Sequence, residues 1–70
     1  MRDLIREKAE TVVKGFKEGL NRYNYKGFTI RKIKKNEINY NIYAYIVEKD
    51  GEEEFLVDSL IESIENILTY

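Results

Sequence analysis

Apolar residues in the first part of the chain recur every three or four positions, which is the spacing of one face of an α-helix. They are Leu4, Ile5, Ala9, Val12, Val13, Phe16 and Leu20. Asp3 can cap the start of this helix, and Gly19 suits its end because glycine readily adopts the left-handed conformation found there. The pattern predicts a helix over 3–19, followed by an exit loop over 21–24.

From Gly27 onward apolar and polar positions alternate, which is typical of half-buried β-strands. Phe28 and Ile30 begin a first strand. A second run follows the polar stretch 34–37 and turns its even-numbered residues to the core, namely Ile38, Tyr40, Ile42, Ala44 and Ile46. Asp50-Gly51 is a strong signal for a tight hairpin turn, and 54–57 gives a third strand. We therefore expect an antiparallel meander of three strands.

A second helix follows the sheet. Ser59 and Glu62 have the spacing of a capping box, in which each side chain bonds backbone N–H groups at the start of a helix. The apolar face behind it consists of Leu60, Ile61, Ile64, Ile67 and Leu68. The sequence thus predicts one α+β domain over residues 1–70, with both helices on one face of the three-stranded sheet.

The amino-acid composition limits the kinds of catalysis and metal binding that the chain can perform. The 70-residue chain contains no cysteine and no histidine, the side chains most used for nucleophilic attack, zinc binding and proton transfer at neutral pH. Glycine-rich phosphate loops are also missing. We expect a protein that is not an enzyme and that uses no metal, cofactor or small-molecule substrate. The absence of disulfides and of long apolar runs favours a cytoplasmic protein without membrane contact.

Charge is unevenly distributed, although 12 basic and 13 acidic residues nearly cancel. Between residues 21 and 36 every charged side chain is basic, and the set comprises Arg22, Lys26, Arg31, Lys32, Lys34 and Lys35. Between residues 48 and 65 the charges are acidic apart from Lys49. In a three-stranded meander these stretches fall on opposite edges. The basic edge could contact nucleic-acid phosphates, the acidic edge could imitate them, and both could simply prevent aggregation between sheet edges.

The sheet face away from the helices is the second candidate surface. With even-numbered residues turned inward, the second strand projects Asn39, Asn41, Tyr43, Tyr45 and Val47 outward. Tyrosine is enriched at protein interfaces and can stack on bases, yet it also has a high strand propensity of its own. In the loop before the first strand, Tyr23 and Tyr25 alternate with cations, a pattern of single-strand binding that also suits the closure of a small core.

Two resemblances concern the order of elements. Helix, three strands, helix is the order of the double-stranded-RNA-binding domain. That family begins its second helix with a Lys-Lys segment, whereas this chain has Asp58-Ser59-Leu60-Ile61-Glu62, so RNA binding does not transfer. The size and acidic stretch also resemble small phage-encoded inhibitors of host defence nucleases, the anti-CRISPR proteins, which implies that the chain blocks a nucleic-acid site on a protein.

Three hypotheses follow. The leading one is a protein-binding module, an inhibitor from a phage or mobile element, that acts through an acidic turn and a tyrosine face; its site comprises Tyr43, Tyr45, Asp50, Glu52, Glu53 and Glu54. The first alternative is a nucleic-acid-binding accessory protein that uses the six basic residues of 21–36. The second is a structural homodimer joined through the tyrosine face.

Overall fold

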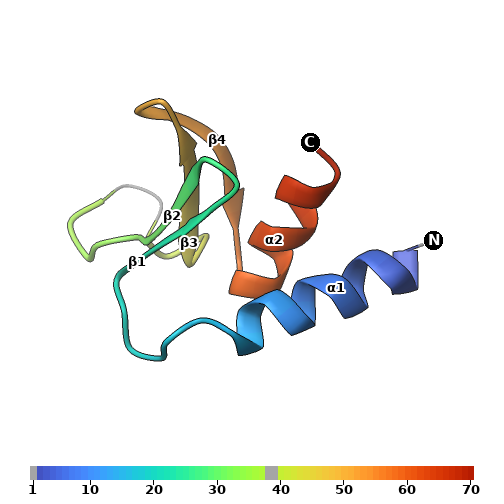
Figure 1. The fold of residues 1–70 in the computed structure, drawn as a ribbon. Coiled ribbons are helices and arrows are strands. Elements are labelled where there is room, and N and C mark those ends of the chain that lie inside the picture. The colour runs from blue at the N-terminus through green and yellow to red at the C-terminus, as the bar shows by residue number, and fades with distance from the viewer. Residues whose placement is uncertain (1, 38–39) are drawn as a thin grey trace.

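The computed structural model describes residues 2–37 and 40–70. Its elements, in chain order, are α1 (Arg2–Lys14), β1 (Arg22–Tyr25), β2 (Phe28–Lys32), β3 (Tyr45–Lys49), β4 (Glu52–Val57) and α2 (Leu60–Leu68). The strands form one antiparallel sheet in the order β1-β2-β3-β4 (Figure 1). The predicted α+β class is confirmed, but the prediction of three strands is wrong. The added strand also separates the fold from the double-stranded-RNA-binding topology.

The unexpected strand, β1, lies where the sequence predicted an exit loop. It pairs with β2 through a two-residue turn at Lys26 (φ 48°) and Gly27 (φ 82°). Asp50 (φ 53°) and Gly51 (φ 82°) make the same kind of turn between β3 and β4. Two consecutive positive φ angles suit Asp-Gly, and lysine is not a usual residue at the first position. Only the Asp50-Gly51 turn was therefore predicted.

The second predicted strand begins later than expected. Ile38 and Asn39 lie outside the described residues, and residues 40–44 form turns and bends rather than a strand. Tyr40 and Ile42, which were expected in the core, are 37% and 64% exposed. The loop joins the sheet at Ala44, whose N–H donates to the Val57 carbonyl. Regular pairing of β3 starts only at Tyr45.

The predicted facing of β3 is also wrong, because Ile46 and Val47 are both buried, at 1% and 0% exposure. Val47 belongs to the main core and pairs with Ile30 of β2. By alternation Tyr45 faces the same side, where it packs against that core, while Ile46 faces away from the helices. The expected outward row of Tyr43, Tyr45 and Val47 does not exist.

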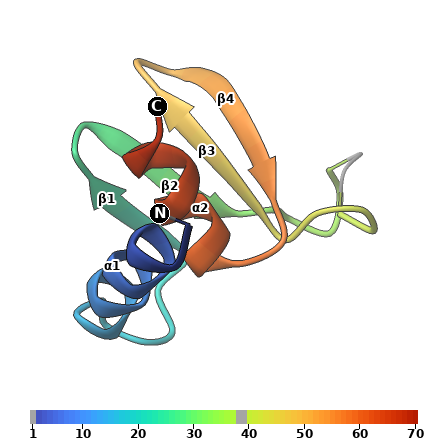
Figure 2. The same cartoon turned by 90° about the vertical axis from the view of Figure 1, so that its right-hand side faces the viewer.

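The two helices lie on the same side of the sheet (Figures 1 and 2). Helix α2 packs on the sheet and buries Ile64 and Ile67, whereas α1 packs chiefly against α2 and buries Ala9. At the start of α2 the Ser59 hydroxyl accepts the Glu62 N–H at 3.1 Å, so the predicted cap is confirmed.

Helix α1 ends five residues earlier than the sequence predicted. Past its last residue, Lys14, the Gly15 and Phe16 N–H groups bond to the carbonyls three residues back, at 3.0 Å each. Gly19 takes a positive φ of 81° farther along the exit. Bonds to the residue three back tighten the chain and end the α-helical pattern. The shorter α1 leaves residues 15–21 to reach β1, and the ring of Phe16 stacks on Tyr23 at 4.8 Å between centroids.

Candidate functional site

A basic groove opens where β1 begins and β2 ends, with a volume of about 570 Å³. We use the name basic groove for this feature throughout, and its lining comprises Asn21, Arg22, Arg31, Lys32, Ile33, Lys34 and Lys35. Five of the six basic residues proposed from the sequence are in that set. The structure therefore brings together most of the alternative, nucleic-acid-binding site.

Strand pairing explains why these residues meet. Arg22 pairs directly with Arg31, and the two project from the sheet face away from the helices. Lys32 points to the opposite side, and its backbone N–H donates to the Asn21 carbonyl at 2.9 Å. The chain then leaves β2 with Ile33, Lys34 and Lys35 at the same end of the sheet. Arg22 and Arg31, nine positions apart in the sequence, are thus placed beside one another by the β1–β2 register.

Arg31 is the most constrained cation of the groove, and its side chain is only 19% exposed. Its guanidinium donates to both carboxylate oxygens of Glu37, at 2.8 and 3.0 Å. Its Nε donates to Glu48 of β3 at 3.4 Å. The hydrogen bond to Glu37 is the largest cause of a raised Arg31 pKa. Arg31 was proposed as a nucleic-acid contact, but two carboxylates neutralise it, so it supports the groove.

Glu37 accepts a third hydrogen bond, from the Lys34 N–H at 2.7 Å. The Arg31 hydrogen bond, followed by this backbone bond, lowers the pKa of Glu37 to about 2. Sequence analysis missed Glu37 and Glu48 as parts of the site. The Lys34–Glu37 spacing of a turn was the one available signal, because the partner strand of Arg31 depends on the register.

Four cations of the groove remain exposed and have no ion pair among the residues that the structure describes. They are Arg22, Lys32, Lys34 and Lys35. Exposed ammonium and guanidinium groups without carboxylate partners attract anions and displace the counterions of a polyanion. These four side chains are the chemically available part of the groove.

Lys26, the sixth proposed basic residue, lies elsewhere. It occupies the β1–β2 turn, with its Nζ 5.9 Å from the centre of the Tyr25 ring. This turn and the β3–β4 turn are at the same end of the sheet, because Phe28 pairs with Lys49. Lys26 is therefore separated from the basic groove by the length of β2.

The acidic hairpin, which we define as residues 50–54, forms the other end of the sheet. Asp50, Glu52, Glu53 and Glu54 are all exposed there. Glu54 is the extra residue of a β-bulge, since Val47 pairs with Phe55 but Glu48 pairs with Glu53. The Glu54 carboxylate accepts a hydrogen bond of 3.5 Å from the Tyr70 hydroxyl.

The tyrosines do not join the acidic hairpin in one surface. Tyr45 begins β3 at the groove end of the sheet, opposite Lys32 and Val57, and Tyr43 is half-buried in the preceding loop. Tyr23 is 8% exposed, stacks on Phe16, and serves the core, while Tyr25 packs partly buried against the same core. None of these four rings is presented as a platform inside the basic groove.

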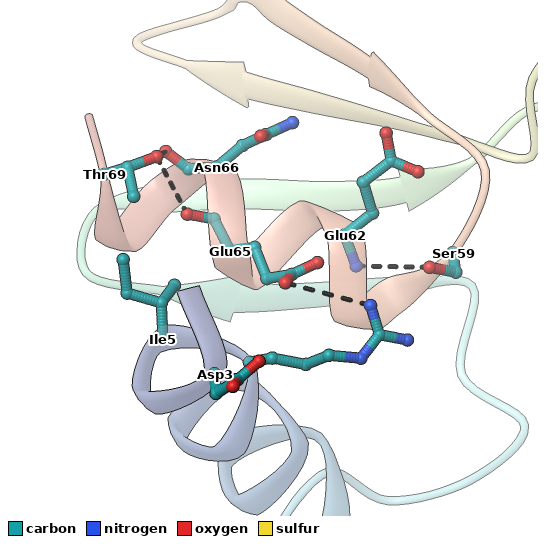
Figure 3. Close-up of a pocket in the computed structure, with 8 residues that line it drawn as sticks. Asp3, Ile5, Ser59, Glu62, Glu65, Asn66 and Thr69 are labelled. Carbon is teal, nitrogen blue, oxygen red and sulfur yellow. Dashed lines mark hydrogen bonds and ion pairs between the residues drawn. The ribbon is translucent and has the colours of Figure 1, made fainter. Parts of the chain in front are cut away.

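A second groove, of about 770 Å³, runs between α1 and α2 (Figure 3). Its polar groups are largely engaged within the protein: Arg6 lies 4.0 Å from Glu65, and the Thr69 hydroxyl donates to the Glu65 carbonyl at 3.0 Å. Glu62, on the same wall, belongs to the cap of α2. This second groove is therefore explained by the packing of α1 against α2, and we do not assign it a ligand.

Comparison of the chain with protein-family models, curated proteins and solved structures finds no match. No helix in residues 2–37 and 40–70 is long and apolar enough to cross a membrane. Within the same residues no three acidic side chains are grouped in a way that could hold a metal ion. The basic groove, with its gathered cations, is the candidate functional site.

Proposed function

We propose that the protein binds nucleic acid through the basic groove and that its main contacts are to the phosphate backbone. The observation that supports this proposal is the meeting of Arg22, Lys32, Lys34 and Lys35 around one groove. Each is exposed, and none has a carboxylate partner among the described residues. Cations of this kind contribute to binding by releasing the counterions that surround a polyanion.

The spread of the four cations favours a polymer over a small anion. They come from two strands and a loop, and neighbouring strands are about 4.8 Å apart. Phosphates along one nucleic-acid strand follow one another every 3.4 Å or so of helix axis. A row of phosphates can therefore contact the four cations at their separate positions, whereas a single phosphate would have to draw their side chains together to one point. The contact contains no base-stacking platform, so we expect little sequence preference.

The separation of acidic and basic residues along the sheet is compatible with nucleic-acid binding through the groove. The exposed acids of 50–54 lie at the far end of β3 and β4, away from the groove. A net charge of −1 would disfavour binding to polyanions in general. However, the electric field of a nucleic acid orients a molecule with separated charges so that its basic end approaches first. The acidic hairpin can thus coexist with phosphate binding.

The protein-binding hypothesis remains a prediction, but for the acidic hairpin without the tyrosines. Its acidic part is exposed and could contact a basic protein surface, but Tyr45 supports the core at the other end of the sheet. The homodimer hypothesis loses its tyrosine face, because the sheet side away from the helices carries Arg22, Arg31 and Glu48 instead. The groove is the candidate whose proposed residues gather in one place.

The test is binding of labelled duplex and single-stranded DNA and RNA, measured across a range of salt concentrations. If four cations contact phosphates, log K against log salt should have a slope of about −3.6 for duplex DNA and about −2.8 for single strands. Replacing Lys32, Lys34 and Lys35 with glutamate should abolish binding. The matched control replaces Lys8, Lys14 and Lys17, which are exposed on or just after α1, and changes the net charge equally.

The control variant should keep most of the affinity and a steep salt slope. Equal loss in both variants would show that overall charge, and not the groove, governs the interaction. No binding by the wild-type protein even at low salt would overturn the proposal and direct the search to a protein partner of the acidic hairpin.

A further inference from the structure

Glu37 is an acidic residue beside the basic groove, and its hydrogen bonds indicate a structural role there. Its carboxylate holds the guanidinium of Arg31 with both oxygens and also accepts the Lys34 N–H at 2.7 Å. The Glu37 N–H in turn donates to the Lys34 carbonyl at 3.0 Å. The turn from Lys34 to Glu37 is thus closed on itself and attached to β2.

The point of attachment is itself fixed. Arg31 is the next-to-last residue of β2 and is paired on both sides, with Arg22 of β1 and Ile46 of β3, and Glu48 of β3 accepts a hydrogen bond from its Nε. All three side chains are partly buried, at 19% exposure for Arg31, 27% for Glu37 and 23% for Glu48. A bidentate arginine–carboxylate pair has a defined geometry as well as a favourable energy. Glu37 therefore transmits the rigidity of the sheet to the loop that carries Lys34 and Lys35.

We infer that Glu37 is a positioning residue of the basic groove: it pins the 34–37 turn to Arg31 and so keeps Lys34 and Lys35 on the groove rim. This inference rests on the proposed phosphate binding. Pre-ordered side chains lose less conformational entropy on binding than mobile ones do. Glu37 should therefore strengthen the binding of a polyanion although it carries a negative charge.

Simple electrostatics predicts that removing the Glu37 charge would strengthen nucleic-acid binding, whereas positioning predicts that it would weaken binding. The inference is therefore testable. If Glu37 were only a competing anion, Glu37→Gln would release Arg31 as a fifth contact, tighten binding, and steepen the duplex salt slope to about −4.5. If Glu37 positions the lysines, the same variant should bind more weakly. Its slope should fall towards about −1.8, the value for Arg22 and Lys32 alone.

The experiment measures the duplex-DNA salt slope for the wild type, Glu37→Gln and Glu53→Gln. Glu53 is exposed in the acidic hairpin, so Glu53→Gln changes the net charge equally and should leave the slope near the wild-type value. Lys34→Ala with Lys35→Ala should lower the slope to about −1.8 in the wild-type background and change it little in the Glu37→Gln background. Full additivity of the two effects would overturn the inference.

A second readout needs no nucleic acid. Hydrogen exchange of the Lys34 amide should accelerate in Glu37→Gln and stay unchanged in Glu53→Gln, because Glu37 accepts the hydrogen bond of that amide. If Glu37→Gln does not fold, Glu37→Asp, which shortens the side chain by one methylene, replaces it. Loss of Lys34 protection with an unchanged salt slope contradicts positioning. Absence of any binding by the wild type contradicts the proposed function instead, so the two failures are distinguishable.

Discussion

The acidic hairpin and the basic groove lie at opposite ends of the sheet and are built in different ways. At the hairpin end, the four acids of 50–54 lie within five positions of the sequence, in and just after a tight turn. At the groove end, Arg22 meets residues 31–35 only because β1 folds back on β2. The acidic cluster is a local property of the chain, whereas the basic groove is a product of tertiary structure. Changes that loosen β1 should therefore damage the groove and spare the hairpin.

Arg31 connects the two ends electrostatically. Like charges face each other across neighbouring strands twice, Arg22 opposite Arg31 and Glu48 opposite Glu53. Such pairs are destabilising when nothing compensates them. The contacts of Arg31 with Glu37 and Glu48 supply that compensation on both sides. The separation of charge along the sheet thus depends on one partly buried arginine.

The largest expected effect is on the attachment of β1. Tyr23→Ala removes a buried ring that stacks on Phe16, and truncation of a large buried aromatic costs about 3 kcal/mol of the free energy of unfolding. Tyr40, 37% exposed in the β2–β3 loop, is the control, and Tyr40→Ala should change stability by less than about 0.5 kcal/mol. Denaturant unfolding measures both values. Equal losses would mean that β1 is not held by its aromatic contact.

The elements that the sequence predicted well are those fixed by neighbouring residues. Ser59 caps α2 as expected because its partner, Glu62, is three residues away. Asp50 and Gly51 form the predicted turn because both tolerate positive φ. The start of α1 was also close to its prediction. In each case the interaction that decides the structure spans only a few positions.

The errors arose where the deciding interaction is distant. Residues 42–47 are apolar at both odd and even positions, so alternation alone could not choose which face of β3 is inside, and pairing with β2 settled it. Lys26-Gly27 carries no turn signal in the sequence, so the pattern predicts a loop where β1 lies. The basic residues of the groove were all visible in the sequence, but the neutralisation of Arg31 was not. Glu48 lies on another strand, and Glu37 meets Arg31 only because the chain turns back on β2 after Lys34.

Substitution of the turn glycines should have a smaller effect on the free energy of unfolding, and the effect should be equal at the β1–β2 and β3–β4 turns. Gly27 and Gly51 each have φ of 82°, and an added Cβ would meet nothing within 4 Å at either site. The whole cost of Gly→Ala is then backbone strain, about 1 to 2 kcal/mol. Asparagine tolerates this conformation better, so Gly27→Asn and Gly51→Asn should be milder. Thermal unfolding of the four variants checks this, and a milder alanine than asparagine would contradict it.

Reversing the acidic hairpin should change nucleic-acid binding little. The row of Lys49 and Glu52 is four residues along β3 from the row of Tyr45 and Lys32, or about 13 Å at about 3.3 Å per residue. That distance exceeds the screening length of about 8 Å in physiological salt. Replacing Glu52, Glu53 and Glu54 with lysine should raise duplex affinity by no more than a few fold at that salt. A large gain would show that the two ends do not act separately.

The smallest effect concerns the acid that belongs to the groove. Because the pKa of Glu37 is lowered to about 2 from 4.5, its contribution to stability is complete above about pH 4.5. It should decline as the pH falls towards 2, since the unfolded chain takes up the proton first. The stability difference between the wild type and Glu37→Gln should therefore shrink over that range in pH-dependent unfolding.

Carboxyl carbon NMR can assign this pH dependence to the residue. The midpoint of the Glu37 signal should lie near pH 2 in the wild type and move towards the ordinary glutamate pKa of 4.5 in Arg31→Gln. Arg31→Gln removes the largest cause of the shift and leaves the Lys34 N–H, so the return should be incomplete. A Glu37 midpoint that does not respond to Arg31→Gln would mean that the loop is not held by this pair in solution. Arg22 would still meet residues 31–35 through the β1–β2 register, but the turn that carries Lys34 would not be fixed to Arg31.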